Sequence, residues 1–197
     1  MADTLPFAID IVRILWARLS QRATDLQYLV EAAVPFEGWL ETEAFLACRE
    51  QQSERGFCEV ALRPTYGSEN VTTDNGQPSV EHGTLRVGGS GEPGDHRWLF
   101  AEVVLLLDGE RADWTTRTEA AIARLLRLGW KRSASVLILV AVGNEDLARL
   151  AAWNRPSLTD GLNLSLRGGG TLRARAFDVK RNPADTLAST LHSTSPA

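Results

Sequence analysis

Two apolar stretches constrain the fold of this chain more than any other feature of its sequence. Residues 98–109 read WLFAEVVLLLDG, and residues 133–143 read SASVLILVAVG. The second stretch has no alternation of polar and apolar residues, which is typical of a β-strand covered on both faces. The first is similarly apolar except for one carboxylate, Glu102. Both are shorter than the roughly 20 residues needed to cross a bilayer, so we predict that they form the centre of a sheet.

The residues before these stretches predict helices followed by strands. Apolar side chains recur at helical spacing over residues 5–30, with Thr4 as a candidate N-cap and a stop before Pro35. A further helix is expected over residues 37–50. Strand patterns follow, as a strand over residues 57–62 and a hairpin over residues 80–107.

The later part of the chain predicts two more helices and a second hairpin. These elements are a helix over residues 112–130, a short helix over residues 144–154, and a hairpin around a glycine triplet over residues 161–179. The order indicates an α/β or α+β domain with a mixed sheet. We expect a single domain over residues 1–192, composed of N-terminal helices (1–51) and a mixed sheet with crossing helices (56–181), followed by a frayed tail (193–197).

The composition indicates a soluble globular protein. Hydrophobic residues make up 44% and charged residues 23% of the 197 residues, and the net charge is -4. This acidic balance argues against non-specific nucleic-acid binding and suits a basic partner. The N-terminus lacks the basic region and cleavage site of a signal peptide, so we expect a cytoplasmic protein that does not bind membranes. Cys48 and Cys58 are expected to be buried and reduced.

The order of elements over residues 37–142 resembles the PD-(D/E)XK nuclease-like, or restriction-endonuclease-like, fold. In that family a leading helix packs on a mixed sheet, and a hairpin carries an acid in its first arm and a (D/E)-x-K motif in its second. Here VEHGTLRVGG and WLFAEVVLLL would be the two arms. The resemblance implies that two acids hold a divalent metal, usually magnesium, and that a lysine positions or activates the attacking water.

Carried over to this chain, the resemblance places Glu102 at the acid of the second arm. The lysine position is Val104, which can neither bind a phosphate nor polarise water. The first-arm acid falls near Thr84, a poor metal ligand, and the nearest acids, Glu81 and Asp95, lie toward the ends of the hairpin. The resemblance therefore implies a fold without the family's usual catalytic set.

Two further positions remain open at this stage. The glutamate that some family members carry on the leading helix would be Glu43, with Glu41 as the competing choice on another side of that helix. A buried Glu102 without a metal needs a partner, which would be Arg86 or Arg97 of the same hairpin, or backbone amides.

These observations lead to three functional hypotheses. The first is a non-catalytic protein that binds another protein, for instance as an immunity or accessory factor in a bacterial conflict or defence system, and that needs no cofactor. The second is a magnesium-dependent nuclease with a rearranged site built from Glu43, Glu81 or Asp95, and Glu102. The third is a homo-oligomeric scaffold.

One basic cluster stands apart from the proposed hairpin. It consists of Arg167, Arg173, Arg175, Lys180 and Arg181. These residues would contact an acidic partner or a nucleic-acid backbone, or they form the solvated face of an edge hairpin.

Overall fold

The computed structural model describes residues 4–66, 81–89, 97–107, 111–128, 133–143, 157–167 and 170–180. Four predicted features lie outside these residues, namely Asp95, Arg181, the short helix at 144–154 and the tail at 193–197. The described part of the chain confirms the mixed α/β fold class. In that part, no helix is long and apolar enough to span a membrane.

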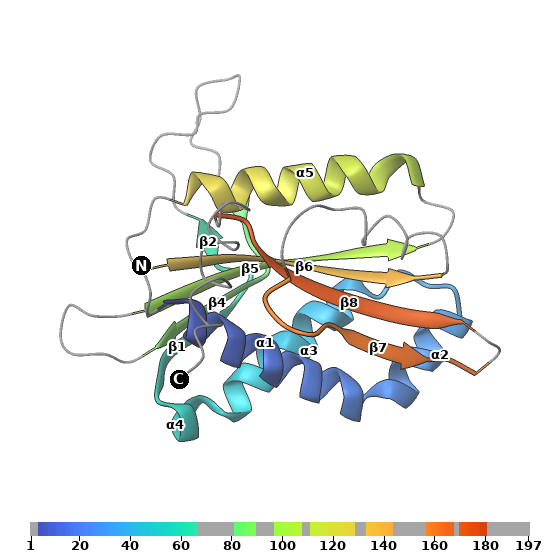
Figure 1. The fold of residues 1–197 in the computed structure, drawn as a ribbon, viewed down its shortest axis with the longest axis horizontal. Helices are drawn as coiled ribbons and strands as arrows, with labels where there is room; N and C mark the ends of the chain where they lie inside the picture. Colours follow the sequence, from blue (N-terminus) through green and yellow to red (C-terminus); the bar gives the residue numbers. More distant parts are fainter. Residues whose placement is uncertain are drawn as a thin grey trace, which may run out of the picture.

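The described strands form one large mixed sheet and one small sheet (Figure 1). In spatial order, the large sheet consists of β1 (Phe57–Leu62), β4 (Leu85–Gly89), β5 (Arg97–Leu107), β6 (Ser133–Val142), β8 (Thr171–Asp178) and β7 (Leu162–Ser165). Strands β5 and β6 run parallel, and the other neighbours are antiparallel. The two most apolar segments therefore lie at the sheet centre, as predicted.

Helices cover both faces of this sheet (Figure 1). One face carries α1 (Thr4–Gln21), α2 (Ala23–Glu31), α3 (Glu37–Glu50) and α4 (Gln52–Arg55), and the other carries α5 (Arg111–Arg127). The bounds of α3 agree with the predicted helix at 37–50. The helical pattern expected over residues 5–30 is formed by α1 and α2, which are separated at Arg22.

The side chains of β5 alternate between two cores, because successive residues of a strand point to opposite faces. One set packs with α1 and α3: Leu99, Ala101, Val103 and Leu105. The other set packs with Leu125 of α5: Phe100, Val104 and Leu106. Burying one large apolar side chain contributes about 1.5–3 kcal/mol. Glu102 belongs to the second set by alternation, so its side chain faces α5.

The first arm of the predicted hairpin is divided into two strands, and only the second of them pairs with β5. A separate two-stranded sheet consists of β2 (Thr65–Tyr66) and β3 (Glu81–His82). The backbone N–H of Arg63 donates to the carbonyl of Thr84 (3.0 Å), which joins this small sheet to the start of β4. Pairing between β4 and β5 runs only as far as Leu85 opposite Ala101. The second half of β5 extends beyond β4.

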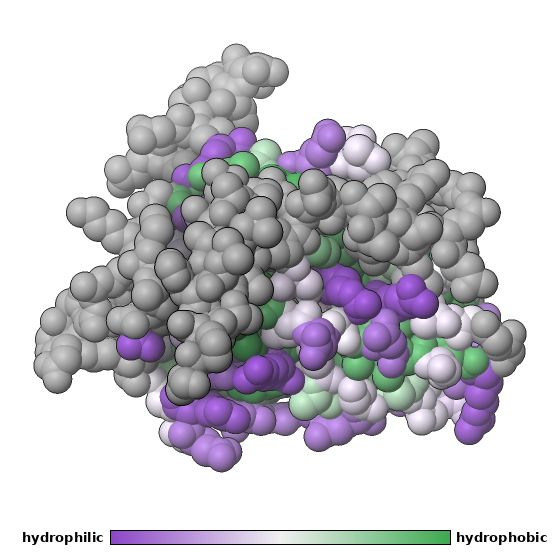
Figure 2. All heavy atoms as spheres, viewed as in Figure 1, coloured by the Kyte–Doolittle hydropathy of each residue, from purple (hydrophilic) through white to green (hydrophobic). Residues whose placement is uncertain are grey.

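The first helix is bound to the C-terminal part of the chain. Helix α1 contacts β5, β6 and β7, and the Trp16 Nε1–H donates to Thr159 Oγ1 (2.9 Å) across 143 positions of sequence. The outer side of α1 carries the exposed residues Asp10 and Arg13, and hydrophilic side chains gather over α1 and α4 in Figure 2. The N-terminal helices are thus an integral layer of the domain.

The two cysteines occupy different environments. Cys48 is buried in α3, where burial raises the pKa of its thiol to about 12. Cys58 was expected to be buried and is exposed instead. A bulge between Phe57 and Glu59 shifts the register of β1 at this point, so the simple alternation of the strand does not hold there. Both thiols are free.

The packing of α5 can be tested with two neighbouring leucines. Leu125 is fully buried against the sheet, whereas Leu126 is exposed. We expect Leu125→Ala to lower the free energy of unfolding by about 2–5 kcal/mol, and Leu126→Ala to change it by less than about 0.5 kcal/mol. Urea unfolding measures both values. Similar losses in the two variants would contradict this orientation of α5.

Candidate functional site

Beyond Ala101, the edge of β5 that faces away from β6 is not paired with β4, and side chains form hydrogen bonds to its backbone. Val103 N–H donates to Thr84 Oγ1 (3.2 Å), and Leu105 N–H donates to Glu37 Oε1 (3.2 Å). The guanidinium of Arg117 donates through Nη1 to the carbonyl of Leu105 (3.2 Å). Backbone groups away from water need such partners. Side chains from the residue before β4, from α3 and from α5 therefore supply the bonds that a paired strand would supply elsewhere.

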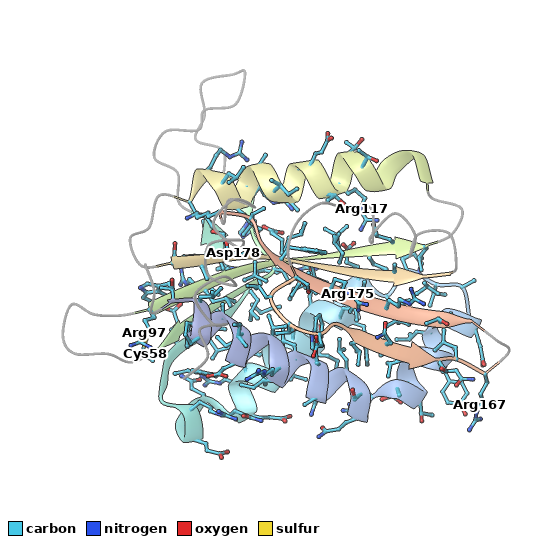
Figure 3. All side chains as sticks on the ribbon, viewed as in Figure 1. Cys58, Arg97, Arg117, Arg167, Arg175 and Asp178 are labelled. Carbon is cyan, nitrogen blue, oxygen red and sulfur yellow. The ribbon has the colours of Figure 1, made fainter. Side chains whose placement is uncertain are left out.

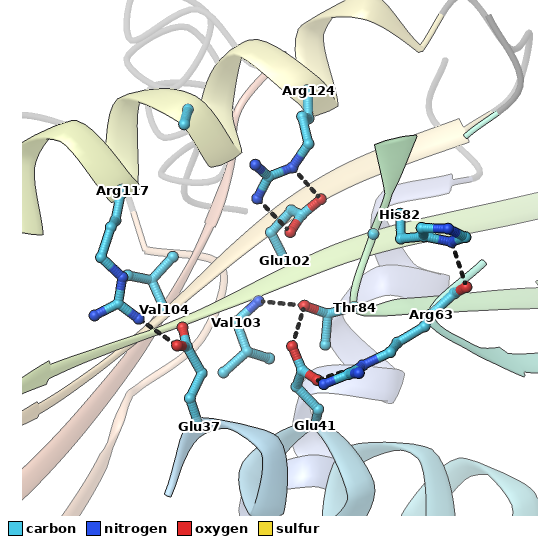
Figure 4. A pocket seen from close by; sticks show the side chains of 12 residues that line it. Glu37, Glu41, Arg63, His82, Thr84, Glu102, Val103, Val104, Arg117 and Arg124 are labelled. Carbon is cyan, nitrogen blue, oxygen red and sulfur yellow. Dashed lines mark hydrogen bonds and ion pairs between the residues drawn. The ribbon is translucent and has the colours of Figure 1, made fainter. Parts of the chain in front are cut away.

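A pocket of about 630 Å³ opens at this edge, between α3 and α5 (Figure 4). Its lining comes from α3, the turn after β1, the segment from β3 to β4, β5 and α5. The lining residues are Glu37, Glu41, Arg63, His82, Gly83, Thr84, Glu102, Val103, Val104, Arg117, Ala120 and Arg124. Its volume is within the range of about 300–1,000 Å³ that is usual for ligand sites.

Three ion pairs line the pocket, and each joins one glutamate to one arginine. Glu102 binds Arg124, Glu41 binds Arg63, and Glu37 binds Arg117. Among the described residues that line this cavity, three carboxylates and three guanidiniums therefore balance in charge. This arrangement is the main chemical feature of the site.

The pair at Glu102 explains how a carboxylate is tolerated inside an apolar strand. Arg124 binds it with two parallel bonds, from Nε to Oε1 (3.2 Å) and from Nη2 to Oε2 (3.0 Å). Such forked geometry is the strongest arrangement of an arginine and a carboxylate. Arg86, one of the expected partners, binds Glu59 and lies over the ring of Trp98 instead. Arg124 is 22 positions from Glu102, and only the packing of α5 on β5 brings them together.

The lower wall of the pocket is formed around Arg63. The guanidinium donates to Glu41 Oε2 through Nε (3.1 Å) and Nη2 (3.0 Å), and the Thr84 hydroxyl donates to Glu41 Oε1 (3.4 Å). Arg63 has a φ of 47°, in the left-handed region that costs a non-glycine residue roughly 1–2 kcal/mol. His82 Nδ1 lies 3.4 Å from the Arg63 carbonyl oxygen. A strained backbone therefore holds this arginine at the mouth of the pocket.

Glu37 sits at the first turn of α3 and bridges to β5 and α5. Burial raises the pKa of this carboxyl group, and the positive charge of Arg117 and the hydrogen bond from Leu105 oppose that rise without cancelling it. The group thus ionises less readily in the folded protein than an ordinary glutamate does.

The sequence-predicted site residues are only partly brought together. Thr84, Glu102 and Val104 line the pocket, and so does Glu41, which was the alternative on the leading helix. Glu43 is buried between α1 and α3, where Arg18 Nε donates to its Oε2 (2.5 Å). Glu43 is not among the residues that line the pocket with Glu37, Glu41 and Glu102.

Two other predicted site residues are less closely defined. Glu81 pairs through its backbone with Tyr66 in the small sheet, and Asp95 is outside the described residues.

Glu37, Arg117 and Arg124 line the pocket but were not predicted from the sequence. Their helical positions carry no local signal of a shared site.

The described residues do not fit a magnesium site in this arrangement. Within the described ranges, no group of three or more histidine, cysteine, aspartate or glutamate side chains is placed to hold a metal ion. Each described carboxylate of the pocket is already bound by an arginine, so a divalent cation would have to displace a guanidinium to reach it. The binding groups that the described part of the pocket offers are therefore arginine N–H donors.

The basic cluster predicted near the C-terminus is spread along β8. Arg167 is exposed at one end of the hairpin (Figure 3). Arg173 and Arg175 are half-buried on the sheet face that also carries Leu139. Lys180, at the other end, donates through Nζ to the Leu128 carbonyl (2.6 Å), at the end of α5. The described members of the cluster thus do not form one compact basic patch.

Comparisons with protein-family models, curated proteins and solved structures found no match. In its described part, the pocket combines a closed strand edge, three ion pairs and one strained arginine.

The ion pair at Glu102 predicts a specific pattern of stability. Arg124→Met leaves a buried carboxylate without its cation, and we expect the free energy of unfolding to fall by about 1–3 kcal/mol. Adding Glu102→Gln to that variant should restore most of the loss, because the neutral amide is less costly to bury. Urea unfolding at neutral pH compares the three proteins. A loss that the second substitution leaves unchanged would mean that packing, and not charge, is responsible.

The raised pKa of Glu37 predicts a dependence of stability on pH. An acid whose pKa is higher in the folded state than in the unfolded state holds its proton more tightly when folded, so its ionisation at higher pH disfavours folding. The free energy of unfolding of the wild type, minus that of Glu37→Gln, should therefore fall as the pH rises from the ordinary value of 4.5 through the raised pKa of Glu37.

Urea unfolding across this pH range measures the difference for Glu37. The control is Glu54→Gln, which removes one carboxylate from an exposed position in α4. A difference for Glu37→Gln that grows with pH would contradict the assignment.

Proposed function

We propose that this chain is a non-catalytic protein that binds another protein, and that its fold is a degenerate form of the PD-(D/E)XK nuclease-like fold. The observation that carries the proposal is the bidentate pair between Glu102 and Arg124. Glu102 is the acid that the family resemblance assigns to metal binding, and here an arginine takes the place of the metal as its counter-charge.

The arrangement of elements supports the fold part of the proposal. Helix α3 precedes β1, β4 and β5, which are neighbours in the sheet, and α5 then leads to β6, which runs parallel to β5. This is the order of the resemblance: a leading helix, antiparallel strands, a crossing helix and a further buried strand. The likeness concerns topology, and it does not by itself carry a function.

The chemistry of the pocket supports the absence of catalysis. Val104 lines the pocket at the position of the family's lysine, so no ammonium group stands beside Glu102 on that strand. The Thr84 oxygen, at the position of the first acid, accepts a bond from Val103 N–H. Both positions serve packing or strand closure in this chain.

The charge of the chain supports a protein partner. The net charge of -4 favours attraction to a partner whose surface is basic overall, and it disfavours a nucleic-acid backbone. An immunity or accessory factor in a bacterial conflict or defence system would have these properties, in the cytoplasm and without a cofactor. A homo-oligomer would be the special case in which the partner is a second copy of the chain.

Affinity capture and a cleavage assay test this proposal together. The intact protein should retain a specific partner from a lysate of its source organism. Arg63→Glu, at the pocket mouth, should reduce recovery, whereas Arg13→Glu, on the outer side of α1, should not. Light scattering of the purified protein identifies self-association.

The same protein should leave DNA and RNA uncut in the presence of magnesium or manganese. Metal-dependent cleavage that disappears in Glu102→Ala would overturn the proposal in favour of a nuclease with a rearranged site. Failure to recover any specific partner, including a second copy of the chain, would also count against it.

A further inference from the structure

In two of the three ion pairs of the pocket, the arginine is more accessible than the carboxylate that binds it. In the Glu102 pair, the arginine side chain is 29% exposed and the carboxylate side chain 4%. In the Glu41 pair, the values are 67% for the arginine and 16% for the glutamate. In the third pair, Arg117 and Glu37 are about equally exposed. A molecule entering the pocket therefore reaches the guanidiniums of Arg63 and Arg124 more readily than the carboxylates that bind them. Figure 4 shows each guanidinium held by its carboxylate.

We propose that this pocket binds a carboxylate group carried by the partner protein, such as the side chain of an exposed aspartate or glutamate. The inference rests on the proposed protein-binding function for the source of the carboxylate. The guanidiniums of Arg63, Arg117 and Arg124 converge on one cavity from the turn after β1 and from α5. A guanidinium carries five N–H donors in a planar fork that matches a carboxylate.

The backbone of Arg63 is a second and independent observation. Glycine or asparagine would adopt its φ of 47° more easily, yet an arginine occupies the position. The Arg63 N–H donates to Thr84 O (3.0 Å), which fixes the turn, and the side chain is directed to the pocket mouth. Strain that is maintained at a charged residue lining a cavity indicates a role for that side chain in binding.

The charge balance of the pocket favours a carboxylate over a phosphate. In the described part of the lining, three carboxylates and three guanidiniums already cancel. A carboxylate adds one negative charge to this set, whereas a phosphate group adds up to two and is repelled more strongly by the three glutamates. A single carboxylate is also small enough to reach the guanidiniums without displacing Glu102, which is buried.

The test is a titration of the intact protein with small probes. Binding is monitored through the arginine Nε–H signals in ¹H–¹⁵N NMR spectra. The probe is N-acetyl-glutamate N-methylamide, which carries one carboxylate, and its matched control is the neutral N-acetyl-glutamine N-methylamide. Inorganic phosphate is the third ligand. Sodium chloride keeps the ionic strength constant, because screening alone changes weak electrostatic binding.

We expect a saturable shift with the glutamate probe, in the millimolar range, and none with the glutamine probe. Arg63→Gln should weaken the affinity about tenfold, as expected for one lost charge-assisted hydrogen bond. Arg13→Gln, on the outer side of α1, should leave it unchanged. Because Arg124→Gln also removes the partner of a buried carboxylate, Arg63→Gln is the deciding variant.

Three outcomes would overturn the inference: no saturable shift with the glutamate probe, equal shifts with both amides, or saturation by phosphate alone. Failure of affinity capture with the glutamate response intact would instead overturn only the proposed protein-binding function. The two proposals are thus tested separately.

Discussion

The backbone of β5 beyond Ala101 must form its hydrogen bonds without β4 beside it, and this requirement organises the site. Thr84, Glu37 and Arg117 provide the missing partners. Each of these side chains also belongs to the pocket lining. The cavity therefore lies where pairing stops because β4 begins only at Leu85, and its lining includes the groups that bond to the unpaired backbone of β5.

The same constraint accounts for the polarity of the pocket. Helices cover both faces of the sheet, so the backbone N–H and C=O groups at this edge of β5 are buried. Buried groups of this kind need hydrogen-bond partners within the protein. Once Glu37 and Glu102 are placed there, each needs a counter-charge, and arginines from α5 reach both of them. Helix α5 thus covers the apolar core with one side and neutralises the sheet edge with another.

Local patterns predicted much of the fold. The apolar runs placed β5 and β6 at the sheet centre, and periodicity gave the bounds of α3, because both signals depend on residues that are near one another in sequence. The site was harder to predict. The partner of Glu102 lies on a different element, and the choice between Glu41 and Glu43 depends on the rotation of α3 against α1. No residue spacing encodes those packing angles.

The bond between Trp16 and Thr159 has a consequence for the order in which the chain assembles. Helix α1 packs on β5, β6 and β7, and all of these strands follow it in sequence. During synthesis, α1 is made before these three strands, so the part of its apolar side that they cover stays uncovered until they have been made. Long-range pairing of this kind slows folding, and an apolar surface exposed meanwhile is prone to aggregation. Helix α1 therefore reaches its complete environment only after β7 has been made.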